Sequence, residues 1–267
     1  MDTTEKDDIL ESAQPSRLTQ FFEVISGLSL FSFRFFKEVF KPPYEFGEIR
    51  NHMVELGMKT LPIVSVTGFI IGLVLAMQSQ PVMIRFGAEA FLPGMVALSV
   101  LRELGPVLTA LIFAGRVSSG IGAELGSMRV TEQIDAMEVS AINPYRFLVV
   151  TRIVACTLIL PILTLYVDFL ALLGGFIAIF LSSGINVESY ISAVIKSVEF
   201  PDFVPSTLKT LFFGFIVGAV GSYKGFNTEN GTVGVGKAST SSVVLSSLII
   251  LLVDMVLVKV HVWLWAQ

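Results

Sequence analysis

Long apolar stretches separated by short polar ones dominate the chain from about residue 61 onward. A transmembrane helix needs about 20 predominantly apolar residues. Five stretches meet that requirement and cover residues 61–78, 91–115, 153–181, 204–221 and 243–265. The pattern therefore predicts an all-α integral membrane protein with about five transmembrane helices.

The pattern before the first predicted span is different. Residues 1–20 open with a crowd of acidic side chains, whereas a cleaved signal peptide opens with positive charge. We interpret them as a disordered cytoplasmic tail, followed by one membrane domain over 21–267. Residues 21–40 are rich in Phe but interrupted by charged side chains, which favours an amphipathic helix lying in the membrane interface. An ordinary first span is the alternative.

Composition supports a membrane location. The chain is 53% hydrophobic and only 15% charged, with a mean hydropathy of +0.77. A soluble domain of 267 residues could not bury that much apolar surface. The one cysteine, Cys156, lies inside an apolar stretch, cannot form an intrachain disulfide, and is interpreted as a packing residue.

Basic residues predict the orientation, because loops rich in Lys and Arg stay in the cytoplasm. One set of segments is rich in such residues: Lys6, Arg17, Arg34, Lys37, Lys41, Arg50 and Lys59 before the first span, Arg116, Arg129, Arg146 and Arg152 between the second and third, and Lys224 and Lys237 between the fourth and fifth. The opposite side receives fewer: Arg85, Lys196, Lys209 and Lys259. We therefore expect a cytoplasmic N-terminus and, after five spans, a C-terminus on the other side.

The loop between the second and third spans carries a helical pattern over residues 120–138. Ile121, Leu125 and Met128 recur at helical spacing, while acidic residues form much of the other face. Asn143-Pro144 then ends the helix, because the residue before a proline is pushed out of the helical region. A helix of this kind docks into a groove on another protein or, as the alternative, lies solvated on the membrane.

Arg102 and Glu103 stand side by side inside the second predicted span. An Arg at the centre of a span costs about 2.5 to 3.5 kcal/mol, so such residues face a cavity or a partner. Neighbours on a helix point about 100° apart, so the two need not pair with each other. Either they line a lipid cavity, where Arg102 attracts a phosphate head group, or they form a structural salt link to a neighbouring span.

Asp168 and Asp254 are single carboxyl groups in the third and fifth spans. Structural hydrogen bonding is the first interpretation and a proton relay the second. Gly231 to Lys237 imitates a phosphate-binding loop, but Ala238 stands where Ser or Thr would hold magnesium, so we expect a turn leading into a helix there. Gly68-xxx-Gly72 and Gly174-Gly175 suit close helix packing.

No sequence pattern for catalysis, metal binding or nucleic-acid binding is present. The chain contains no HExxH, no CxxC and no paired histidines at metal-ligand spacing, and no basic aromatic patch. We therefore expect no catalytic residue, no metal ligand and no nucleic-acid partner.

Several separated blocks closely resemble the MlaE family of ABC-transporter permeases. They are VTGFIIGLVLAMQ at 66–78, LRELGPV at 101–107, AGR at 114–116, AELGSMRVTEQIDAM at 123–137, the Asn143-Pro144 pair and GVGKASTSSVV at 234–244. The resemblance covers the chain from about Lys41 onward, in the family's order and spacing.

The resemblance implies a homodimer in the bacterial inner membrane that works with other proteins. The first is a cytoplasmic ABC ATPase dimer, which binds ATP and magnesium, so that this chain itself needs no cofactor. The second is a periplasmic lipid-binding MCE-domain protein, and a small accessory cytoplasmic subunit is a possible third. The cargo would be phospholipid or a related hydrophobic molecule, and the transport would contribute to outer-membrane lipid homeostasis. The C-terminus would then be periplasmic.

The same resemblance assigns roles to residues. Residues 123–137 match the coupling helix that rests in the ATPase groove, so Glu124, Met128, Glu132 and Gln133 are expected to transmit force. Ile71, Val74 and Leu75 are expected to line the substrate path with Arg102 and Glu103. The competing hypothesis is an ion-coupled secondary transporter or channel that uses intramembrane carboxylates.

Overall fold

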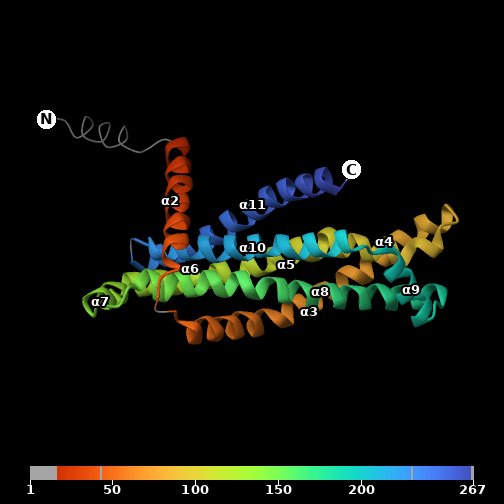
Figure 1. The fold of residues 1–267 in the computed structure, drawn as a ribbon, viewed down its shortest axis with the longest axis horizontal. Coiled ribbons are helices and arrows are strands. Elements are labelled where there is room, and N and C mark those ends of the chain that lie inside the picture. Colours follow the sequence, from red (N-terminus) through yellow and green to blue (C-terminus); the bar gives the residue numbers. More distant parts are fainter. Residues whose placement is uncertain (1–16, 43, 230, 266–267) are drawn as a thin grey trace. The chain divides into compact units, whose positions relative to one another are not determined.

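The computed structural model describes residues 17–42, 44–229 and 231–265 (Figure 1). No strand occurs within those ranges, so the predicted all-α class is confirmed. The chain divides into two units, Met1–Pro42 and Pro43–Gln267. The first unit contains α2, Arg17–Glu38, close to the helix expected over 21–40. Its place at a membrane surface stays a prediction, and residues 1–16 of the expected tail lie outside the described residues.

The second unit contains five helical runs that are long and apolar enough to cross a membrane: Phe46–Arg85, Glu89–Val130, Tyr145–Ser183, Phe200–Phe226 and Gly231–Trp263. Single helices form three of them, α3 (Phe46–Arg85), α10 (Phe200–Phe226) and α11 (Gly231–Trp265). Each run is longer than its predicted span, because the helix continues into flanking polar sequence. The prediction of five apolar helices is confirmed.

The second run is one helical path with local changes of winding. It passes through η1 (Glu89–Phe91), α4 (Leu92–Ser99), the π-helical η2 (Val100–Leu104), α5 (Gly105–Phe113), the π-helical η3 (Ala114–Ser118) and α6 (Ser119–Val130). Pro106 lacks the N–H that would bond to the carbonyl of Arg102 in an α-helix, which explains why the winding changes at η2.

The third run starts with the π-helical η4 (Tyr145–Val150) and continues as α8 (Thr151–Ser183). Helix α8 packs against α3 and α10, and α10 also packs against α6 and α11 (Figure 1). The glycines noted in the sequence lie at the first of these contacts. A Cβ on Gly72 would overlap the backbone of Ala171, and a Cβ on Gly174 would overlap the carbonyl of Phe69. Only glycine allows α3 and α8 to approach this closely.

The helix expected over 120–138 is interrupted. Helix α6 ends at Val130 and α7 covers Gln133–Val139, and between them Glu132 adopts a left-handed backbone with φ 59°. The first half is also less exposed than expected, because Ile121 and Leu125 are buried in the core against α10 and α11. Only the α6–α7 turn and α7 present a mostly exposed surface.

Two other loop expectations need correction. The loop between the fourth and fifth runs is short, so Lys224 and Lys237 belong to α10 and α11 and not to a loop. Lys209 lies within α10 and is buried, so it is not a loop cation of the outer side. A short helix that the pattern did not indicate, α9 (Val187–Ser197), follows α8, and Asn186 caps it by accepting a hydrogen bond from the backbone of Ser189 at 2.8 Å.

Candidate functional site

A cavity of about 540 Å³ lies between the α4–η2 segment, α10 and α11. Its ionisable lining is provided by Arg102 and Glu103 of η2, by Lys209 of α10 and by His261 of α11, and Ser99 and Ser206 add hydroxyl groups. Most of the other lining side chains are apolar: Leu98, Pro205, Leu208, Phe212, Leu257 and Val260. A concave, largely apolar pocket with a few convergent polar groups is the usual form of a small-molecule site.

Arg102 forms an ion pair across to α10. Its Nε donates to Asp202 Oδ1 at 2.8 Å, and a terminal guanidinium nitrogen lies 2.5 Å from the same oxygen. The other oxygen of Asp202 accepts the backbone N–H of Glu199 at 3.0 Å and so helps to cap α10. The start of α10 is therefore fixed to the charged residue in η2, while the Arg102 side chain remains 52% exposed toward the cavity.

Glu103 enters a second ionic group with Lys209 and Asp254. The Lys209 ammonium donates to Glu103 Oε2 at 2.6 Å and to Asp254 Oδ1 at 2.9 Å. The Lys209 side chain is only 7% exposed, whereas that of Glu103 is 43% exposed. One buried cation thus joins carboxylates from two other helical runs, and removal of such a cation is strongly destabilising.

The spacing of these residues explains the two pairings. Asp202 and Lys209 are seven residues apart and share one face of α10. Arg102 and Glu103 are adjacent, point in different directions, and reach the two ends of that face. The two interpretations from the sequence therefore meet in one arrangement, since both residues line a cavity and both form salt links to a neighbouring run. Asp202 and Lys209 were missed as partners, although their spacing was visible.

Ile71, Val74 and Leu75 lie elsewhere. All three are on α3, which does not contribute to the lining of this cavity. Val74 is 39% exposed, and Leu75 packs against the core cluster around Val96 and Ala171. The structure of the single chain does not bring these residues together with Arg102 and Glu103, and their role in a substrate path stays a prediction.

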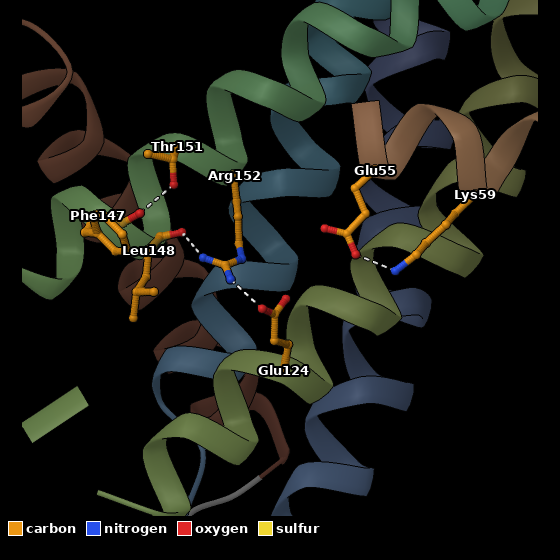
Figure 2. A network of polar contacts seen from close by, with 7 residues as sticks. All are labelled: Glu55, Lys59, Glu124, Phe147, Leu148, Thr151 and Arg152. Atoms are coloured by element: carbon orange, nitrogen blue, oxygen red, sulfur yellow. Dashed lines mark hydrogen bonds and ion pairs between the residues drawn. The ribbon is translucent and has the colours of Figure 1, made fainter. Parts of the chain in front are cut away.

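The four residues expected to transmit force are distributed over α6, the α6–α7 turn and the start of α7. Glu132 is exposed in the turn and Gln133 is exposed as the first residue of α7, whereas Met128 is partly buried against the core. Glu124 is exposed and accepts a hydrogen bond from the buried Arg152 of α8 at 2.6 Å (Figure 2). Arg129 and Asp135 pair at 2.5 Å and join α6 to α7.

The remaining polar residues of the spans differ in their surroundings. Asp168 of α8 is buried, its Oδ1 lacks a hydrogen-bond partner, and the atom lies against Gly105, where a Cβ would overlap it. The expected hydrogen bond to that oxygen is not formed, unlike at Asp254.

The segment resembling a phosphate-binding loop is helical from Gly231 onward, so the expected turn there is wrong and its backbone N–H groups cannot form a phosphate-binding loop.

Five long apolar helices and a charged, apolar-walled cavity between them define a multi-pass membrane protein with a ligand-sized site. The chain matches the family model for the permease MlaE over residues 49–260. It belongs to the MlaE permease family, and it is accordingly an ABC transporter permease subunit.

Three relatives illustrate the range of this similarity. A probable ABC transporter permease protein of Rickettsia prowazekii is 38% identical over 233 residues, which cover 87% of this chain and 90% of the relative. The intermembrane phospholipid transport system permease protein MlaE of Haemophilus influenzae is 35% identical over 221 residues, 80% of this chain and 85% of the relative. The chloroplastic protein TRIGALACTOSYLDIACYLGLYCEROL 1 of Arabidopsis thaliana is 32% identical over 211 residues, 78% of this chain and 60% of the relative.

Proposed function

We propose that this chain is the membrane subunit of an ATP-driven transporter that moves phospholipids or related hydrophobic molecules between the inner membrane and a periplasmic MCE-domain carrier. In this way it contributes to outer-membrane lipid homeostasis. The observation that carries the proposal is the cavity between η2, α10 and α11, in a chain of the MlaE permease family.

The form of the cavity suits an amphipathic cargo. Arg102 exposes half of its side chain toward the cavity, beside the partly exposed Glu103. A guanidinium group forms strong charge-assisted hydrogen bonds with phosphate oxygens, so Arg102 provides the contact for a lipid head group. The apolar side chains of Leu208, Phe212 and Leu257 provide the surface for acyl chains. The printed name of the Haemophilus relative, which refers to phospholipid transport, supports the same substrate class.

The partners follow from the same proposal. Two copies of the chain form the permease, and a cytoplasmic ATPase dimer binds ATP and magnesium. The exposed α6–α7 turn with Glu132 and the adjoining Gln133 is the surface that the ATPase contacts. A small cytoplasmic accessory subunit completes the assembly. The N-terminus lies in the cytoplasm and, after five spans, the C-terminus lies in the periplasm.

Reconstitution tests this function directly. The complex would be purified through a tag on this chain, inserted into vesicles that contain fluorescent phospholipid, and supplied with ATP in the absence of an ion gradient. We expect co-purification of a nucleotide-binding subunit and ATP-dependent transfer of lipid to the carrier. Flux by the isolated chain that needs an ion gradient and no ATP would overturn the proposal in favour of ion-coupled transport.

A matched pair of variants connects the cavity to the activity. Phe212→Glu places a charge on the apolar wall and is expected to abolish lipid transfer. Phe200→Glu changes the same residue type at an exposed position at the start of α10, outside the lining, and is expected to leave transfer close to that of the unmodified complex. Equal effects of the two changes would count against the cavity as the lipid site.

A further inference from the structure

Arg152 is a charged residue in an apolar place. It lies in the first turn of α8, directly after η4, and its side chain is only 5% exposed. The sequence pattern predicts that Arg152 lies in a cytoplasmic loop, where a cation is normally solvated. A buried guanidinium is retained where its donors are satisfied, and both terminal nitrogens of Arg152 have acceptors.

One of those acceptors belongs to the π-helical segment that begins the third run. Arg152 donates to the carbonyl oxygen of Leu148 at 2.9 Å, and the neighbouring Thr151 hydroxyl donates to the carbonyl of Phe147 at 2.6 Å (Figure 2). Both carbonyls lie in η4. Short π-helical turns are frequent at functional sites. The side chains of α8 thus hold η4 in its present winding.

The other acceptor belongs to α6. Arg152 donates to Glu124 Oε1 at 2.6 Å, and Glu124 is 56% exposed, so the pair extends from the interior to the surface of the helix that carries the α6–α7 turn. Glu55 of α3, which Figure 2 shows near Arg152, interacts with it electrostatically, and so does His52 of the same helix. Glu55 is engaged with Lys59 of its own helix. Arg152 is therefore the group that joins α6 to the start of α8.

Helix α8 does not line the cavity, but it leads from this junction to the residue that follows η2. Sixteen residue steps separate Arg152 from Asp168, which corresponds to about 24 Å of helix. Asp168 lies against Gly105, the residue that follows η2 with its Arg102 and Glu103. A displacement of the N-terminal end of α8, where Arg152 lies, therefore also shifts Asp168 against Gly105, next to the segment that carries the cavity charges.

We propose that the Glu124–Arg152–Leu148 link is the connection by which movement of the α6–α7 segment is passed to η4 and α8. Arg152 is a positioning residue in this mechanism, since it touches neither lipid nor nucleotide. The inference rests on the proposed function, because it assumes an ATPase that moves the α6–α7 segment. It adds a specific mechanical contact that runs beside the covalent path through η3 and α5.

The test measures coupling and not activity alone. The full complex with Arg152→Met would be reconstituted in vesicles, and lipid transfer and ATP hydrolysis would be measured in the same sample. We expect ATP hydrolysis to continue while the number of lipids moved per ATP falls on the order of tenfold, a typical size for coupling between two sites.

Two further variants keep the test decisive if Arg152→Met does not assemble. Glu124→Ala removes the link at a half-exposed position and is expected to lower the lipid-to-ATP ratio. Glu124→Gln keeps an oxygen acceptor for Arg152 and is expected to restore most of that ratio. The double change Glu55→Gln and Lys59→Gln is the control, because it removes an ion pair of the same neighbourhood and leaves no unpaired carboxylate beside Arg152.

The outcomes separate the inference from the function on which it rests. Absence of ATP-dependent lipid transfer in the unmodified complex contradicts the proposed function. Transfer by the unmodified complex, together with an unchanged lipid-to-ATP ratio in Glu124→Ala and in any Arg152→Met complex that assembles, overturns the link alone. A parallel fall of hydrolysis and transfer, with the ratio preserved, also overturns it and assigns the pair to assembly.

Discussion

The two groups of charged side chains in the second unit differ in what surrounds them. Around the cavity, Lys209 is buried between two carboxylates, and Arg102 and Glu103 expose about half of their side chains. At the junction of α6, η4 and α8, Arg152 is buried, but its partner Glu124 is exposed, and neither residue lines the cavity between η2, α10 and α11. The first arrangement is suited to contact a ligand, and the second to hold two helices together.

The two groups also differ in how well the carboxylates are solvated when their basic partner, Lys209 or Arg152, is removed. Lys209 neutralises carboxylates from two other helical runs, so its loss leaves Asp254, whose side chain is 12% exposed, poorly solvated and without a cation. Glu124 can be solvated when Arg152 is removed. Substitution of the buried Lys209 should therefore affect stability and ligand binding together, whereas substitution of Arg152 should separate stability from transport.

The largest effect is expected for Lys209→Met. The change leaves Glu103 and Asp254 without their shared cation and should cost about 3 to 5 kcal/mol of stability, with loss of lipid transfer. Thermal unfolding of the purified complex in detergent measures the first effect, and Lys196→Met, at an exposed residue of α9, is the control. The triple change Glu103→Gln, Lys209→Met and Asp254→Asn should recover stability without transport. An unchanged unfolding temperature of Lys209→Met would show that the ionic group of Glu103, Lys209 and Asp254 does not stabilise the protein.

A smaller effect is expected where α8 packs against α3. Gly72→Val introduces a side chain that overlaps the backbone of Ala171. The change should lower the free energy of unfolding by about 1 to 3 kcal/mol, the usual range for overpacking. Gly47→Val is the control in the same helix, because a Cβ there meets nothing within 4 Å. Unfolding of the two variants in detergent is compared with that of the unmodified complex. Equal stability would contradict the close approach of α3 and α8.

The helical runs and the charged pair Arg102 and Glu103 were predictable from the sequence, because a bilayer requires long apolar helices and makes every charge within them conspicuous. Their partners were not. Arg152 was counted as a loop cation because the predicted third span began at residue 153, whereas the helical run begins at Tyr145. Lys209 was counted with the outer-side cations although it lies within the predicted fourth span, because hydropathy did not reveal its two carboxylate partners. Hydropathy records how apolar a segment is and does not record which helix face meets which.

The break in the expected helix over 120–138 has a different origin. Glu132 adopts a positive φ, which non-glycine residues other than Asn and Asp seldom do, so nothing in the local pattern indicated the end of α6. The burial of Ile121 and Leu125 was equally hidden, because an amphipathic face packs on its own chain or on a partner with the same periodicity. Tertiary contacts decided both.

A modest effect on stability with a larger effect on transport is expected for Arg102→Gln. Asp202 keeps the backbone N–H of Glu199 as a partner, and the Arg102 side chain is half exposed, so the loss of stability should stay near about 1 kcal/mol. Transfer of phospholipid should fall on the order of tenfold if the guanidinium binds phosphate, since a charge-assisted hydrogen bond contributes about 1.5 to 3 kcal/mol. Binding of fluorescent phospholipid to the purified complex measures the effect, and unchanged affinity would assign Arg102 to structure alone.

The smallest effect is expected for Arg129→Gln, which provides the sharpest contrast with Arg152. Both arginines pair with a carboxylate in the α6–α7 region, but the Arg129 side chain is 40% exposed and its partner Asp135 is 53% exposed. Exposed ion pairs contribute up to about 1 kcal/mol, so the thermal stability of the isolated permease should change little. The lipid-to-ATP ratio of the full complex should also stay within about twofold, a change that corresponds to less than 0.5 kcal/mol of coupling free energy.

If Arg129→Gln lowered that ratio as far as Arg152→Met does, burial and the contact with η4 would not distinguish the two pairs. The transmission of movement would then belong to the α6–α7 turn as a whole, because Arg129 joins α6 to α7 without contacting α8.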